Sequence, residues 1–164
     1  MIIWRGSDTE VTEGRKWFSI SDDGGKTLTP VTELKYDDGS RFYSPSSIHR
    51  TIRHSATGKL YWIGNIVPEP PKGNMPRHTL IIAEVNEDIP AIIKDSVFVI
   101  DYQQGTDSDD LQLSNFSVLE NRETHDIELY LTRYGSLCSI AEDPVKYYES
   151  DCYRYIVNVE NNHA

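Results

Sequence analysis

The sequence has little cysteine and no histidine pattern typical of a metal site. Two cysteines, Cys138 and Cys152, are too few for a disulfide framework and lack the spacing of metal ligands. Free thiols are the expected state, and a single disulfide across a hairpin is the alternative. The five histidines form no H-x-x-x-H or H-E-x-x-H pattern. We therefore expect neither a bound metal nor a cofactor.

Long apolar runs and an excess of basic residues are also missing. No stretch of about 18 apolar residues exists, so no membrane-spanning helix is expected. The N-terminal residues show no basic region followed by an apolar stretch, so no signal peptide is visible. The parent protein's compartment, whether secreted or periplasmic, is left open. The net charge of −10 argues against a nucleic-acid groove, because phosphates would be repelled. The alternative meaning of this acidity is solubility alone.

The residues that are present favour β-strands. The 164 residues suffice for one domain with a core, and ten tyrosines recur with Trp, Thr, Val and Ile in short runs. No helical periodicity is found, so the sequence predicts an all-β fold. We expect strands at Ile2–Arg5, Lys16–Ile20, Val31–Tyr36, Ser47–His54, Leu60–Val67, Thr79–Val85, Val97–Tyr102, Phe116–Glu120, Ile127–Arg133 and Tyr153–Val159.

The stretch Ser21-Asp22-Asp23-Gly24-Gly25-Lys26-Thr27-Leu28 predicts a rigid hairpin corner. Asp23 can accept hydrogen bonds from the following N–H groups, and the glycines can take positive φ. Ser21 can hold the bend locally, and Leu28 can anchor it to a core. An ordinary β-turn or a calcium-loop look-alike are the alternatives.

This octapeptide resembles the Asp-box of sialidase-like (BNR-repeat) β-propellers, with Leu28 where Trp or Phe is usual. Ser21, Asp23 and Gly25 match the other positions of the box. In that superfamily the box links the third and fourth strands of a blade, away from the substrate. The order of the later segments is also similar, and the resemblance runs from Ile2 to Tyr155. These segments are Tyr43–Arg50 with its Ser-Pro pair, Thr57–Asn65 and Pro76–Leu80.

The resemblance implies about three four-stranded antiparallel blades of a six-bladed propeller, the first blade lacking its inner strand. The blades would span 1–38, 44–102 and 112–160, with a tail at 161–164. Part of a ring leaves two apolar faces open. We therefore expect the missing blades of a parent protein, or a second copy, to close the ring.

The resemblance also implies a channel where arginines hold a substrate carboxylate, because a guanidinium presents two parallel donors. By position, Arg5 and Arg77 are expected to face this channel, and Asn65 to orient a sugar hydroxyl or an arginine. Arg50 depends on strand register. The alternative for each arginine is an ordinary ion pair.

The catalytic residues of the family are incomplete here. Sialidases use a Tyr nucleophile paired with a Glu, and an Asp acid/base. The Asp comes from an early blade that this chain lacks. Tyr153 and Glu120 are weak candidates for the pair, and Tyr153 has packing as its alternative role. Ser114-Asn115-Phe116 stands where relatives have Tyr-Pro.

The expected function is therefore the C-terminal portion of a sialidase-like glycoside hydrolase, inactive as an isolated chain, with a glycan as its partner. A non-catalytic glycan-binding or scaffold fragment is the alternative, and an unrelated β-sandwich with a chance Asp-turn is the third possibility. The loop Asp107–Asp110 either binds a cation or is simply solvated. Trp17 and Trp62 either pack in the core or stack on a sugar.

Overall fold

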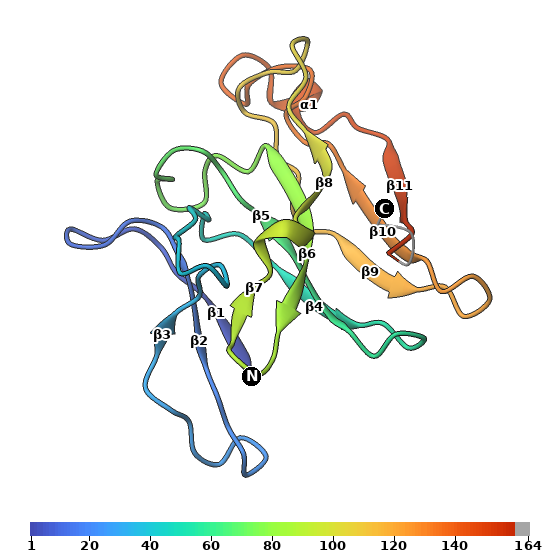
Figure 1. Cartoon of the computed structure of the whole chain (residues 1–164). Helices are drawn as coiled ribbons and strands as arrows, with labels where there is room; N and C mark the ends of the chain where they lie inside the picture. Colours follow the sequence, from blue (N-terminus) through green and yellow to red (C-terminus); the bar gives the residue numbers. More distant parts are fainter. Residues whose placement is uncertain (160–164) are drawn as a thin grey trace.

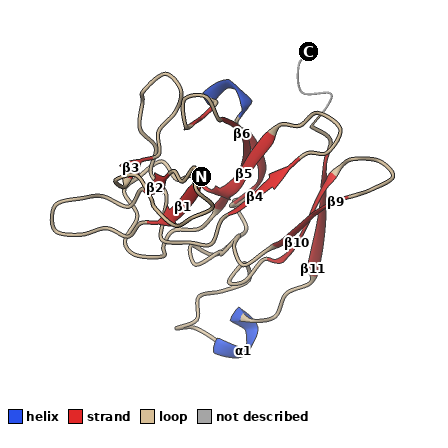
Figure 2. Cartoon of the chain, turned by 90° about the horizontal axis from the view of Figure 1, so that it is seen from below, coloured by secondary structure: helices blue, strands red, loops and turns tan. Residues whose placement is uncertain are grey.

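The computed structural model describes residues 1–159. It contains three antiparallel sheets that follow one another in the chain (Figures 1 and 2). The first sheet has the order β1 (Ile2–Arg5), β2 (Lys16–Ser19) and β3 (Thr32–Glu33). The all-β prediction is confirmed. In the described part of the chain no helix is long and apolar enough to cross a bilayer.

The second and third sheets are also built from strands that neighbour each other in sequence. The second sheet runs β4 (Arg50–Arg53), β5 (Leu60–Asn65), β6 (Thr79–Asn86) and β8 (Phe98–Tyr102), with β7 (Ala91–Ile92) beside the end of β6. The third sheet places β10 (Ile127–Thr132) between β9 (Ser117–Glu120) and β11 (Cys152–Val157). Figure 2 shows the second sheet between the other two.

The second sheet is the middle layer because its strands are apolar on both faces. Successive side chains of a strand point to opposite faces. Trp62 accordingly packs in a core with Leu34 and Phe42 on the side of the first sheet. Ile63 packs with Leu129 and Leu131 on the side of the third sheet. The expectation that Trp62 packs in the core is confirmed, because its side chain is fully buried.

The outer faces of the first and third sheets are only partly apolar. The first sheet exposes Ile2 and Trp4, and the third exposes Leu119 and Ile156. The centre of the third sheet's outer face is instead polar, unlike the expected apolar face. There the buried Glu128 accepts two hydrogen bonds from Arg154 (2.7 and 3.1 Å) and others from the side chains of Tyr130 and Asn121.

Several elements differ from the sequence prediction. The strand expected at Val31–Tyr36 covers only Thr32–Glu33. β4 begins at Arg50 instead of Ser47, because the Ser47 carbonyl accepts a hydrogen bond from the Lys16 side chain. Two short helices, η1 (Lys94–Ser96) and α1 (Pro144–Tyr147), were not expected. α1 begins after Asp143, whose carboxylate accepts from the N–H groups of Val145 and Lys146.

The stretch Ser21–Leu28 forms the turn between β2 and β3, at the lower end of the first sheet in Figure 1. Asp23 Oδ1 accepts from the N–H groups of Lys26 (2.9 Å) and Thr27 (3.0 Å), and these bonds, with those from the Thr27 and Ser21 hydroxyls, lower the pKa of Asp23 to about 2. Gly24 and Gly25 take φ of 75° and 88°. The expected anchoring by Leu28 is wrong, because its side chain is 43% exposed on a turn that stands clear of the core.

Both cysteines are free, Cys138 buried and Cys152 exposed, as expected. Residues 1–159 hold no cluster of His, Cys, Asp or Glu able to bind a metal ion. The last residue of the expected third blade, 160, and the expected tail, 161–164, lie outside the described residues.

Candidate functional site

A cationic hollow lies between the first and second sheets. It has a volume of about 460 Å³ and is lined by the end of β1 and the start of β4. Its lining residues are Ile3, Trp4, Arg5, Ile48, His49 and Arg50. The structure therefore brings together Arg5 and Arg50, two of the predicted ligand-binding residues.

Lys16 adds a third positive group beneath this hollow. It lies directly opposite Arg5 in the β1–β2 ladder, and its side chain is fully buried. The ammonium Nζ donates to the carbonyl oxygens of Pro45 (2.6 Å) and Ser47 (3.1 Å). Burial, together with the charge of Arg5, lowers the pKa of Lys16 from its ordinary 10.5 to about 7.

These cations have no acidic partner in the described chain. Within residues 1–159 no salt bridge involves Arg5, Lys16 or Arg50. The Arg50 guanidinium donates only to the neighbouring His49 carbonyl (3.2 Å). An unpaired cation cluster in a chain of net charge −10 is unusual, and it favours the binding of an anion.

His49 forms the wall of the hollow on the side of the second sheet. Its ring lies 6.2 Å from the Trp62 ring. Burial, with the charges of Lys16, Arg5 and Arg50, lowers the pKa of His49 to about 4. His49 is therefore neutral at physiological pH and is not itself part of the positive charge.

A second hollow continues along β4. It has a volume of about 630 Å³ and shares Ile3, His49 and Arg50 with the first. Beyond them lie Arg53 and Glu87, which form an ion pair of 2.6 Å. The groove is therefore positive and unpaired near Arg5, and neutralised at its other end.

Arg77 lies in a different set of contacts. Its guanidinium donates to Gln112 Oε1, and Gln112 in turn donates to the Tyr147 hydroxyl. Burial lowers the pKa of Arg77. Arg77 is not among the residues that line the cationic hollow, and no hydrogen bond or ion pair within residues 1–159 joins it to Arg5. Its contacts are instead with the segment that leads into the third sheet and with α1.

Asn65 is fully buried at the end of β5. Its amide Nδ2 donates to the carbonyl oxygens of Thr79 (2.9 Å) and Leu113 (2.9 Å), and more weakly to Arg77 (3.4 Å). These bonds tie the second sheet to the segment that leads into the third. Because the N–H donors of the Asn65 amide bond to backbone carbonyl oxygens, this side chain holds backbone segments in place.

The candidate nucleophile pair is not assembled. Tyr153 lies opposite Leu131 on β10, and Glu120 lies opposite Ile127. Four residues of strand separate these positions, or roughly 13 Å along the strand. Tyr153 is 42% exposed, and its ring contacts Tyr155.

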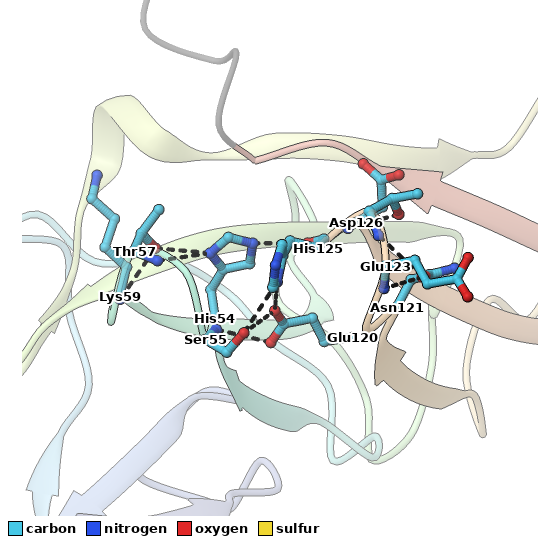
Figure 3. Close-up of polar contacts among 10 residues, drawn as sticks. His54, Ser55, Thr57, Lys59, Glu120, Asn121, Glu123, His125 and Asp126 are labelled. Carbon is cyan, nitrogen blue, oxygen red and sulfur yellow. Dashed lines mark hydrogen bonds and ion pairs between the residues drawn. The ribbon is translucent and has the colours of Figure 1, made fainter.

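Glu120 belongs instead to a cluster at the tips of two hairpins (Figure 3). Its carboxylate accepts from the Ser55 hydroxyl (2.6 Å), the Ser55 N–H (2.8 Å) and His125 Nδ1 (2.8 Å). His54 Nε2 bonds to the His125 carbonyl oxygen (2.8 Å). We call this group, Ser55, His54, Glu120 and His125, the hairpin latch.

The hairpin latch contains Ser, His and Glu but lacks the order of a catalytic triad. In a triad the carboxylate and the serine contact different nitrogens of the imidazole. Here Ser55 Oγ and Glu120 Oε1 both contact His125 Nδ1, and the serine hydroxyl donates to the carboxylate. The latch therefore joins the second and third sheets.

Another polar cluster involves the acidic loop. Arg133 forms ion pairs with Asp101 and Asp107, and Tyr155 donates to Asp101. Burial and the hydrogen bond to Asp101 raise the pKa of Tyr155, so its phenol is not activated. Asp107 therefore forms an ion pair with Arg133. The sequence had predicted that this loop either binds a cation or is solvated.

Sequence reasoning found Arg5 and Arg50 but missed Lys16 and His49. One signal was available for Lys16. Lys16 and Phe18 alternate along one strand, so both side chains point to the same face, and Phe18 packs against the core. His49 had no comparable signal, because it lies in an irregular segment.

Comparison of the chain with models of protein families, with curated proteins and with solved structures finds no match. The fold and the site described above therefore rest on the residues of this chain alone.

Proposed function

We propose that this chain is part of a sialidase-like propeller and binds an acidic glycan through its carboxylate in the cationic hollow. The observation that carries the proposal is the meeting of Arg5 and Arg50 in one hollow without an acidic partner in residues 1–159. Two guanidinium groups suit a carboxylate because each presents paired donors.

The position of the Asp-box turn supports the same proposal. In the resembled family the box lies away from the ligand. Here the box comes after Ser19, the last residue of β2, whereas Lys16 is the first residue of β2 and lies next to the hollow. The two features are thus at opposite ends of the first sheet, as the resemblance implies.

Binding without hydrolysis is the function that the geometry favours for the isolated chain. Tyr153 and Glu120 lie at opposite ends of the third sheet, and Glu120 is occupied by Ser55 and His125. A hydrolase would then need catalytic groups supplied by further blades. The parent glycosidase and the non-catalytic binder both remain compatible with this proposal.

The decisive experiment is a binding titration of the methyl α-glycoside of N-acetylneuraminic acid, followed by NMR. We expect shifts of residues around the hollow, and binding that weakens with salt. Arg5→Gln should lower the affinity at least about tenfold, since one charge-assisted contact contributes about 1.5–3 kcal/mol. Arg122→Gln, at an exposed turn of the third sheet, is the control with the same charge change. Equal binding by both variants would contradict the proposal.

Assembly with further blades or a second copy is part of the same proposal. Among residues 1–159, β1 pairs with β2 alone, which leaves its other edge without a strand. Ile2, Trp4, Leu119 and Ile156 are exposed on the outer faces. Size-exclusion chromatography with light scattering tests self-association. We expect a dimer that weakens in Ile156→Glu but not in Val145→Glu, a control on α1. A monomer at all concentrations would exclude the second copy as the partner.

A further inference from the structure

Arg5 and Lys16 break a general rule of β-sheets. They lie directly opposite each other on antiparallel strands and share the face that packs against the second sheet. Like charges in such a pair are destabilising. Violations of local rules are expected mainly at functional positions. A bound anion is the simplest compensation for this repulsion.

Lys16 is held in a way that tolerates loss of its charge. The two carbonyl oxygens of Pro45 and Ser47 accept two hydrogen bonds from Nζ. A charged ammonium has three N–H donors, whereas a neutral amine still has two. Both hydrogen bonds can therefore persist when the proton is lost. The surrounding fold then need not change between the two protonation states.

The groups that face Lys16 are all basic or neutral. Arg5 lies opposite it on β1, and His49, in the segment before β4, is close enough for the charge of Lys16 to lower the pKa of its ring. The adjoining strand β3 is followed by Leu34, whose N–H bonds to the Lys16 carbonyl. Arg15, the residue before β2, is paired with Glu13 and Glu33. No carboxylate among residues 1–159 therefore offsets the charge of Lys16.

We propose that Lys16 is a hidden member of the anion site, and that an anion bound at Arg5 and Arg50 makes Lys16 take up a proton near and above neutral pH. The proposal rests on the proposed function of the hollow as an anion site. Without ligand, Arg5 and burial together disfavour the charged lysine, whose pKa lies about 7. A negative charge in the hollow opposes the repulsion from Arg5 and so favours the ammonium.

Among Arg5, Arg50, His49 and Lys16, Lys16 is the group that can receive that proton. Arginines stay protonated at all relevant pH values. His49, with a pKa of about 4, remains neutral above pH 6 unless the anion raises its pKa by more than two units. By linkage, binding that takes up a proton must weaken as the pH rises, by up to about tenfold per pH unit. The affinity should thus fall between pH 7 and 9.

The test is a direct measurement of proton uptake. Unbuffered protein and the methyl α-glycoside of N-acetylneuraminic acid are mixed at pH 8 in a pH-stat, and the acid needed to hold the pH is recorded. Uptake approaching one proton per bound ligand is expected. Binding without proton uptake would overturn this inference and leave the proposed function standing. Absence of binding would overturn both.

Two variants assign the proton to a residue. Lys16→Met should abolish the uptake, and Lys26→Met, at the exposed Asp-box turn, should leave it unchanged. If Lys16→Met does not fold, the Cε resonance of Lys16 in the wild-type protein supplies the answer. Its titration midpoint should rise by at least one pH unit when ligand is added. An unchanged midpoint in the presence of bound ligand would refute the inference.

Discussion

The side-chain amide of Asn65 donates a 2.9 Å hydrogen bond to the carbonyl oxygen of Leu113, 48 residues further along the chain. It also bonds to the Thr79 carbonyl on the neighbouring strand. A single buried side chain thus joins β5, β6 and the segment that enters the third sheet.

Asn65→Ala should therefore destabilise the protein by about 2–3 kcal/mol, because buried carbonyl groups lose their donors. Urea unfolding followed by tryptophan fluorescence measures this change. Asn74→Ala, at an exposed loop position, should change stability little. Weaker glycan binding by Asn65→Ala at unchanged stability would show that Asn65 contacts the ligand instead.

Glu120→Gln should weaken the hairpin latch by about 1–3 kcal/mol, since its carboxylate accepts three hydrogen bonds. Although burial opposes it, the bonds from Ser55 and His125 lower the pKa of Glu120 to about 2. The contribution of Glu120 is thus present above pH 4.5 and is lost as the pH falls toward 2.

Thermal unfolding of the wild type and Glu120→Gln at pH 3 and pH 7 checks this prediction. The two proteins should differ more at pH 7 than at pH 3. Glu123→Gln, in the same turn but exposed, is the matched control. A difference that does not depend on pH would mean that the charge of Glu120 has no role in the latch.

Stability should rise with pH because of two buried bases. The pKa of His49 falls from 6.5 to about 4, and that of Lys16 from 10.5 to about 7. The unfolded chain therefore binds more protons than the folded one between pH 4 and 6.5, and again between pH 7 and 10.5. In both windows the free energy of unfolding increases with pH.

The Lys16 window is measurable by urea unfolding at pH 7, 8 and 9. The slope from one group is at most about 1.4 kcal/mol per pH unit. Lys16→Met should lose this slope, whatever its absolute stability, while Lys26→Met should keep it. The same slope in all three proteins would show that Lys16 is charged in the folded state.

The isolated chain should not hydrolyse fluorogenic sialosides. Tyr153 and Glu120 pair with residues that lie four positions apart on β10, so the two side chains are not adjacent. The Glu120 carboxylate also already accepts hydrogen bonds from Ser55 and His125. A fluorescence assay over hours, with a known sialidase as positive control, measures turnover. Hydrolysis that disappears in Arg77→Ala would establish activity and require a different catalytic arrangement.

Much of the strand order was predictable from local pattern. The apolar runs of β5 and β6 are bounded by Gly, Pro and polar residues, so their positions followed from composition. α1 escaped notice because a single turn has no periodicity, although Asp143-Pro144 is a typical helix start. β7 has only two residues and forms through contact with β6.

The site was less predictable because it depends on pairing between distant segments. Arg5 was expected to face a ligand, but its neighbour Lys16 became apparent only from the β1–β2 register. Arg50 pairs with Ile63, whose side chain packs toward the third sheet, so the register of β4 against β5 alone would not have placed Arg50 at the hollow. The alternation of Lys16 with Phe18 indicates which face Lys16 shares, but not that its side chain is fully buried.

The second and third sheets are tied at both ends, by Asn65 at the end of β5 and by Ser55 with Glu120 at the opposite hairpin tips. Because contacts join the two sheets at both ends, we expect them to unfold together as one cooperative unit. The first sheet is joined to the second by the Lys16 hydrogen bonds to the Pro45 and Ser47 carbonyls and by the core around Trp62. The cationic hollow lies between these two sheets, so its shape depends on both of them being folded.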